Sequence, residues 1–147
     1  MDHLGELLNV IGAGSVLEKM RMHGTKCSRL LLKVIALALL HELIEDIGGR
    51  GYSIIADEST DVSVIKYLAF CVRYYSAAKD DIVTDFLSFV EVSTATGKAL
   101  ADATLGYLRK VGLDPQKMIG FGSDNAANMT GVDHGCFKYL KDEVRTL

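Results

Sequence analysis

Proline, cysteine and an excess of basic residues are scarce in this chain of 147 residues, and each shortage excludes a class of protein. With a single proline and 49% hydrophobic residues, the chain is not a disordered one. Its 16 lysines and arginines are outnumbered by 19 acidic residues, so the net charge of −3 gives no general basic field. We therefore expect the chain alone to bind nucleic acid weakly.

An apolar run long enough to cross a membrane is also missing. The most apolar segment, Leu30–Leu43, contains Lys33 and Glu42. Its uninterrupted part, Val34–Leu40, is far shorter than the ~20 residues that a membrane span needs. The segment is predicted to be a buried helix of a soluble protein with no membrane partner.

The three cysteines, Cys27, Cys71 and Cys136, are far apart and form no Cys-x-x-Cys pair. An odd number at such spacing does not suggest a disulfide framework. We therefore predict an intracellular protein in a reducing compartment, with each thiol acting as a small core residue.

Two segments share one pattern, in which a short apolar run ends in acidic and small polar residues. The first, Tyr52–Asp61, contains Asp57, and the second, Met118–Met129, contains Asp124. Short apolar runs bounded by turn-forming residues are typical of buried strands. Open α/β sheets bind ligands just past the C-terminal ends of their strands. We expect Asp57 and Asp124 to follow two neighbouring parallel strands and to lie close together.

The rest of the chain predicts helices and strands around these segments. Residues 1–25 are weakly patterned, with Gly12 and Gly14 interrupting any long helix, and residues 26–147 are expected to form one domain. Both faces of the segment Ile82–Val92 are apolar, so both are expected to be covered. The predicted elements are, in order, a helix over Lys26–Ile47 ended by Gly48, strands over Lys66–Tyr75 and Ile82–Val92, a helix over Gly97–Val111 capped by Thr94 or Thr96, a strand over Lys117–Gly122, a helical turn over Ala126–Met129, and a helix from Cys136 to the end.

This order predicts an α/β fold. Three consecutive strands most simply form an antiparallel meander, and a helical crossover can lay a fourth strand parallel to the first. A partial ribonuclease H-like sheet flanked by helices results. The ends of strands one and four would lie about 4.8 Å apart, so Asp57 and Asp124 could share a divalent cation.

The chemistry of such a pair favours Mg²⁺ or Mn²⁺. Two close carboxylates repel each other, and a hard cation relieves the repulsion by binding their oxygens together with water. A second ion would permit phosphodiester cleavage by the two-metal mechanism. From the pattern alone, Asp124 could instead be a helix N-cap and Asp57 a turn residue. No small-molecule substrate is indicated, because the segment Gly120-x-Gly122 lacks the third glycine of a dinucleotide site.

The two blocks resemble those of hAT-superfamily transposases and their domesticated zinc-finger relatives. Ser53–Asp61 is similar to the first acidic block of that family. Gly122–Met129, followed by Gly131 and Gly135, is similar to the second. The resemblance covers about Lys26–Leu147.

The resemblance implies a transposase-type ribonuclease H-like domain with Asp57 and Asp124 as catalytic, metal-binding residues. They match the first two acids of a DDE-type triad. In the family these acids hold Mg²⁺ or Mn²⁺ for DNA cleavage and strand transfer. The implied partners are transposon-end DNA and further copies of the protein, and the implied location is the nucleus.

The chain departs from the family pattern in its third acid. That acid is a glutamate after a long helical insertion, which this chain does not contain. Glu143 comes too early to replace it, and Glu58 and Asp61 are expected to be solvated turn residues or hydrogen-bond acceptors beside the site. Asn125 and Asn128 are expected to satisfy the backbone of the turn after the fourth strand.

The sequence leaves the enzymatic status open. One hypothesis is a fragment of a transposase catalytic domain, inactive alone and with its fourth strand as an exposed edge. The alternative is a domesticated module for protein or DNA interaction in which the acids are relics. A third hypothesis, a von Willebrand A-type metal site at Asp57, requires a serine where Asp61 stands and an alternating α/β fold. Metal binding distinguishes the first two.

Overall fold

The computed structural model describes residues 3–19, 24–60 and 66–147. The chain divides into two compact units, Met1–Leu43 and Ile44–Leu147. Among the described residues, no helix has both the length and the apolar character needed to span a bilayer.

The N-terminal third of the chain is helical. A helix is confirmed over the predicted range Lys26–Ile47, with one π-helical turn inside it, and Gly48 ends it with a φ of +58°. An earlier helix was not predicted. The elements are α1 (His3–Ile11), the 3-10 turn η1 (Val16–Lys19), α2 (Gly24–Leu30), the π turn η2 (Leu31–Ile35) and α3 (Ala36–Ile47).

The buried helix predicted over Leu30–Leu43 is wrong in its burial. Leu32, Leu37 and Leu39 are 71%, 58% and 60% exposed. An apolar stripe at helical spacing predicts that one face of a helix is apolar. It does not show that another element packs against that face.

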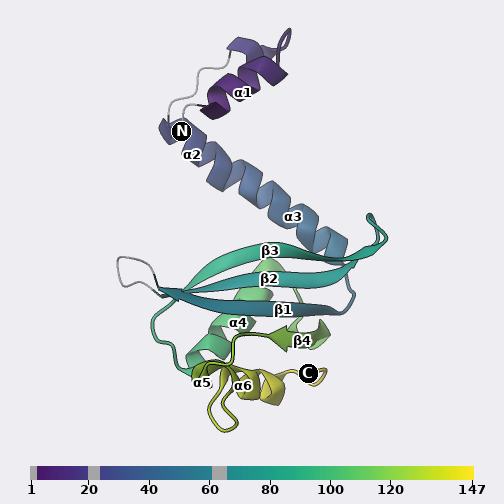
Figure 1. The fold of residues 1–147 in the computed structure, drawn as a ribbon. Coiled ribbons are helices and arrows are strands. Elements are labelled where there is room, and N and C mark those ends of the chain that lie inside the picture. The colour runs from purple at the N-terminus through teal and green to yellow at the C-terminus, as the bar shows by residue number, and fades with distance from the viewer. Residues whose placement is uncertain (1–2, 20–23, 61–65) are drawn as a thin grey trace. The chain divides into compact units, whose positions relative to one another are not determined.

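The second unit contains the predicted sheet, with strands in the order β3-β2-β1-β4. Strand β1 pairs with β2, and β2 with β3, in antiparallel fashion, while β4 lies parallel to β1 at the sheet edge (Figure 1). The meander with its parallel fourth strand is therefore confirmed. The strands are β1 (Tyr52–Thr60), β2 (Lys66–Ser76), β3 (Asp81–Val92) and β4 (Met118–Gly122).

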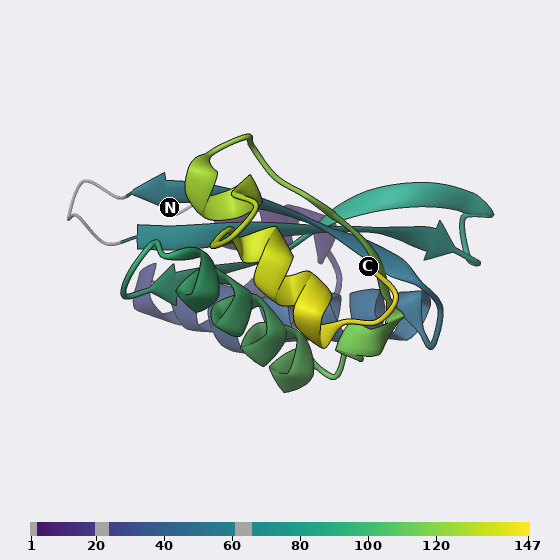
Figure 2. The same cartoon turned by 90° about the horizontal axis from the view of Figure 1, so that it is seen from below.

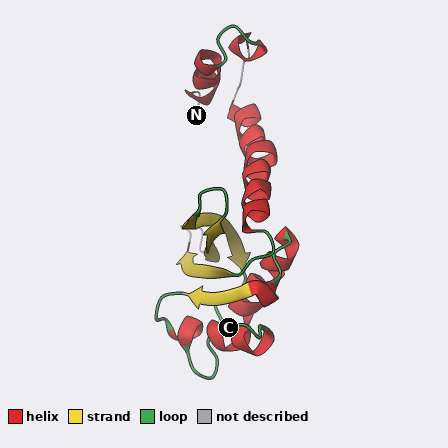
Figure 3. Ribbon diagram, turned by 90° about the vertical axis from the view of Figure 1, so that its right-hand side faces the viewer, coloured by secondary structure: helices red, strands yellow, loops and turns green. Residues whose placement is uncertain are grey.

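The helices of this unit follow the predicted order, and Figure 3 shows them in red beside the yellow strands. Thr96 caps α4 by accepting a hydrogen bond from the Ala99 amide, and Gly112 ends the helix at a φ of +88°. The last helix stops at Glu143, so its predicted extension to the end is wrong. The Thr146 hydroxyl donates to the Met118 carbonyl at 2.7 Å, which draws the terminus back to β4. The elements are α4 (Gly97–Val111), η3 (Pro115–Lys117), α5 (Ala127–Thr130) and α6 (Cys136–Glu143).

One face of the sheet is covered by α4 and α6, which lie on the same side of it (Figure 2). Tyr52, Ile54 and Ala56 of β1 alternate onto that face and are at most 1% exposed. Phe70 stacks on Tyr107 of α4 at 5.9 Å, and Phe121 stacks on Phe137 of α6 at 6.3 Å. The core of the unit lies in this layer.

The opposite face, called the open face below, carries exposed apolar side chains, so the prediction that both faces of β3 are covered is wrong. Cys71 pairs with Phe86, whereas Phe70 pairs with Ser88, so Leu87 is an extra residue in β3. This bulge brings Phe86 and Phe89 onto one face, where they are 56% and 62% exposed and 5.0 Å apart.

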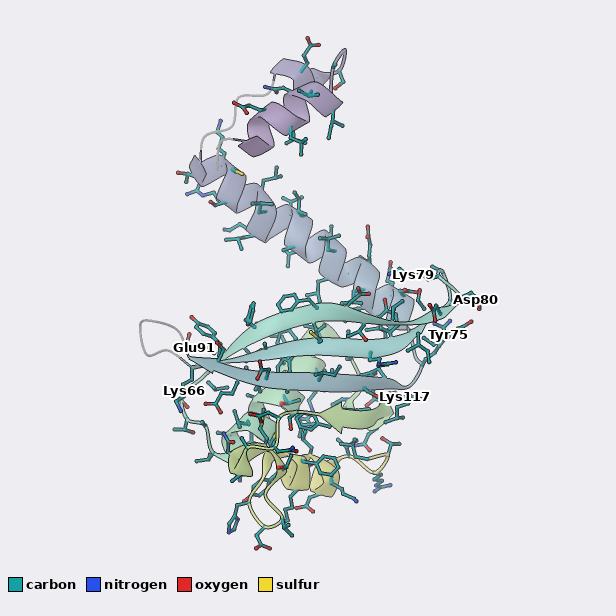
Figure 4. All side chains as sticks on the ribbon, in the orientation of Figure 1. Lys66, Tyr75, Lys79, Asp80, Glu91 and Lys117 are labelled. Atoms are coloured by element: carbon teal, nitrogen blue, oxygen red, sulfur yellow. The ribbon has the colours of Figure 1, made fainter. Side chains whose placement is uncertain are left out.

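Polar and charged side chains lie at both ends of the sheet (Figure 4). Lys66 and Glu91 lie at the end where β1 finishes. Tyr75, Lys79 and Asp80 lie at the β2–β3 turn, where Asp80 adopts a φ of +52° and accepts a hydrogen bond from the Tyr75 hydroxyl.

Candidate functional site

Asp57 lies inside β1. The prediction that it follows the end of this strand is wrong. Antiparallel pairing with β2 extends β1 to Thr60 and sets Asp57 opposite Ala69. Strand alternation turns Asp57 away from the covered face, and its side chain is exposed. Its carboxylate has no hydrogen-bond or ion-pair partner among the residues that the structure describes. Both oxygens are thus free to bind a ligand.

Asp124 lies two residues beyond the end of β4 and is also exposed. One carboxylate oxygen, Oδ1, accepts a hydrogen bond from the Ala126 amide at 3.3 Å. This is an Asx turn, and the helix N-cap role that the pattern alone allowed for Asp124 is wrong, because the N-cap of α5 is Ala126. The second oxygen, Oδ2, makes no hydrogen bond to another described residue.

Asp57 and Asp124 hold equivalent positions relative to the parallel pair of strands. The β1–β4 ladder ends at the pair Ile55–Gly122, and Asp57 and Asp124 each lie two residues further on. Paired strands lie about 4.8 Å apart, and the pairing with β4 stops at Gly122, before either acid is reached. Gly122 itself lies beside Ile55, and a Cβ atom there would lie 3.8 Å from the Ile55 side chain.

Glu58, the next residue, points to the other face and has different partners. Its Oε2 accepts a hydrogen bond from the Asn128 side-chain amide at 2.8 Å, and its Oε1 lies 3.4 Å from the Lys66 ammonium. The same amide also donates to the Ala95 carbonyl at 3.2 Å. The prediction that Asn128 satisfies its own turn is wrong, because both partners are far away in the chain. Glu58 lies within β1 and accepts hydrogen bonds, which is one of the two roles predicted for it.

Comparison with known families agrees with this topology. The model of the ZMYM1/FAM200, RNase-like domain family (DUF4371) matches residues 6–135, which is most of the chain. The chain belongs to this family. No solved structure matches the chain.

In the described part of this RNase-like domain, no third acid completes a metal-binding group. Among the described residues, no group of three histidine, cysteine, aspartate or glutamate side chains is arranged to hold a metal ion. Glu143 lines a shallow hollow between α4 and α6 with Asp102 and Tyr139, in the helical layer rather than on the open face. Asp61 lies outside the described residues.

The cysteines of the RNase-like domain are free and form no cluster in the part of the chain that the structure describes. Cys27 and Cys136 are buried, as predicted, and Cys71 is half-buried. Burial raises the pKa of the Cys136 thiol to about 12, which keeps it neutral and unreactive.

Proposed function

We propose that this RNase-like domain descends from a hAT-like transposase and that Asp57 and Asp124 together hold one Mg²⁺ or Mn²⁺ ion. The observation that carries the proposal is the β1–β4 register, in which both acids follow the Ile55–Gly122 pair by two residues.

The donor set suits a hard, hydrated cation. Carboxylate oxygens and water are the ligands that Mg²⁺ prefers, and Mg²⁺ commonly uses only one or two carboxylates. Asp57 has both oxygens free and Asp124 has one, so a single ion can be held without breaking a hydrogen bond. A bound ion would supply Lewis-acid activation at a phosphate. The residues would not anchor the second ion that the two-metal mechanism requires.

The proposed partner of the ancestral transposase is transposon-end DNA, and the proposed location is the nucleus. This chain by itself carries a net charge of −3. Phosphate contacts by lysine and arginine dominate DNA affinity, so other surfaces would have to supply most of the binding. Cleavage by this chain alone is not part of the proposal.

The test is a Mn²⁺ titration of the whole chain, followed by calorimetry and by paramagnetic broadening of NMR signals. We expect weak binding, with broadening confined to the end of β1 and the loop after β4. Asp57→Asn and Asp124→Asn should each abolish it, while Asp133→Asn, at an exposed turn residue, should leave it unchanged. Binding that survives both site substitutions contradicts the assignment.

A second candidate function is a domesticated interaction module, and the apolar open face favours it. Ile82, Phe86 and Phe89 are more than half exposed there. Exposed apolar patches commonly mark protein interaction sites. Absence of Mn²⁺ binding in the unmodified chain would favour this function over the first.

A further inference from the structure

Asn128 joins three segments that no local hydrogen bonding connects. It lies in α5, and its single amide nitrogen donates to Glu58 of β1 and to the Ala95 carbonyl in the connection before α4. Glu58 and Asn128 are 70 residues apart in the chain. The three segments therefore meet at the second half of β1, next to Asp57 in the chain.

The segment that carries Asp124 depends on such an anchor. On one side it is held by the β4 ladder, which ends at Gly122. On the other side is α5, a helix of four residues whose N-cap, Ala126, provides no side-chain hydrogen bond. A helix this short has little stability of its own. Met129 is buried, and Asn128 bonds the helix to β1 through Glu58, while α5 also packs against α4 and α6.

Glu58 is suited to receive this bond and unsuited to be a metal ligand. One of its oxygens is taken by Asn128 and the other is paired with Lys66. Its side chain is only 21% exposed, and hydrogen bonds to charged groups of this kind are stronger than those between neutral groups. Consecutive residues of β1 thus have different roles. Asp57 lies on the open face, whereas Glu58 lies on the opposite face and contacts α5.

We propose that Glu58 and Asn128 are positioning residues, and that their hydrogen bond holds the loop 123–126 so that Asp124 stays level with Asp57. The inference rests on the proposed function, since it assigns these residues to the same cation site. It also makes a separate statement about the loop that can be checked without metal.

The experiment uses the whole chain and two readouts. Hydrogen exchange followed by mass spectrometry reports opening of residues 123–130, and Mn²⁺ titration reports the site. Asn128→Ala should speed exchange in that loop while strands β1 to β3 stay protected. It should also weaken Mn²⁺ binding by about 10–100-fold, the usual cost of losing a residue that orients a metal ligand.

Substitutions at Glu58 separate positioning from folding. Glu58→Gln keeps an oxygen that can accept from Asn128, so it should retain most of the affinity and protection. Glu58→Ala removes the acceptor and should behave like Asn128→Ala. Asn125→Ala is the matched control, because Asn125 is exposed in the same loop and should have no effect on either readout. If Asn128→Ala does not fold, the contrast between the two Glu58 variants decides the matter.

The outcomes separate the two proposals. Unchanged exchange and unchanged affinity in Asn128→Ala and Glu58→Ala would overturn the positioning role while leaving the metal site intact. No Mn²⁺ binding by the unmodified chain would overturn the proposed function. In that case faster loop exchange in both alanine variants would still support the role of the Glu58–Asn128 hydrogen bond in holding the loop, and unchanged exchange would overturn it.

Discussion

Gly97, the first residue of α4, lies where no side chain fits. A Cβ atom at this position would lie 2.7 Å from the backbone nitrogen of Cys136 and 2.7 Å from the carbonyl carbon of Gly135. Both are backbone atoms of the segment leading into α6, so they cannot rotate aside. The absence of a side chain at Gly97 therefore sets the distance between α4 and the start of α6.

We predict that Gly97→Ala destabilises the chain by about 1–3 kcal/mol, the usual cost of overpacking. Gly106→Ala, in the same helix but with open space around it, should stabilise by about 0.5–1 kcal/mol because alanine favours a helix. Urea unfolding of both variants measures the difference. Equal effects of the two substitutions would show that the close approach at Gly97 is not maintained in solution.

Two buried groups predict loss of stability at alkaline pH. Burial raises the pKa of the Cys136 thiol from 9.0 to about 12. Burial and the nearby Asp114 carboxylate raise the pKa of the Tyr52 phenol above its ordinary value of 10.0. Each group ionises more readily in the unfolded chain, so its contribution is fully present below the unfolded pKa and is lost as pH rises through the folded one.

The free energy of unfolding should therefore fall progressively from pH 9 to pH 11. Cys136→Ala should cost about 1 kcal/mol at pH 7 and make the fall above pH 9 shallower. Urea titrations at a series of pH values measure both slopes. A variant with the same slope as the parent would mean that the thiol is not protected from solvent.

Among the strands, β3 has an exposed apolar face that invites association. Phe86 and Phe89 are more than half exposed and contact each other, while Leu87 between them is only 6% exposed. We predict that Phe86→Thr with Phe89→Thr reduces self-association in sedimentation velocity. Little stability should be lost, since surface substitutions usually stay within about 0.5 kcal/mol.

The matched control is Leu87→Thr, which should destabilise by about 2 kcal/mol or more because it removes a buried side chain. It should not reduce self-association. If the double substitution leaves association unchanged, the exposed edge of β4 is the better explanation.

The sequence patterns predicted the elements well where the signal is local. The cap at Thr96, the end at Gly112 and the meander of three strands all follow from residue types and spacing. They also predicted that β4 lies beside β1, which is the basis of the candidate site.

The patterns failed where distant residues decide the outcome. The second half of β1 is polar and is extended only because Lys66–Ala69 of β2 pairs with it. The bulge at Leu87 changes which residues share a face, and alternation cannot reveal it. The hydrogen bond from Asn128 to Glu58 has no local signature at all.

At the scale of the whole molecule, we predict that the chain does not cut DNA. Two aspartates suffice for one ion, and in-line displacement by the two-metal mechanism requires two ions about 3.5–4 Å apart. The measurement is a nicking assay on supercoiled and hairpin DNA with Mg²⁺ and with Mn²⁺, using Asp57→Asn as the background control. Cleavage above that background would require a further acid of this chain, Glu143 or Asp61 first, to complete the site.

The separation of Glu58 and Asn128 also bears on how the chain is made. The two residues are 70 positions apart. At 5–20 residues per second, a ribosome needs roughly 4 to 14 seconds between them. Once β3 has been made the meander can form, but β1 has an unpaired edge until β4 follows, and Glu58 lacks its amide partner for the whole interval. The nascent chain therefore passes through a stage in which β1 is open to other strands, and chaperone binding at that stage would protect it.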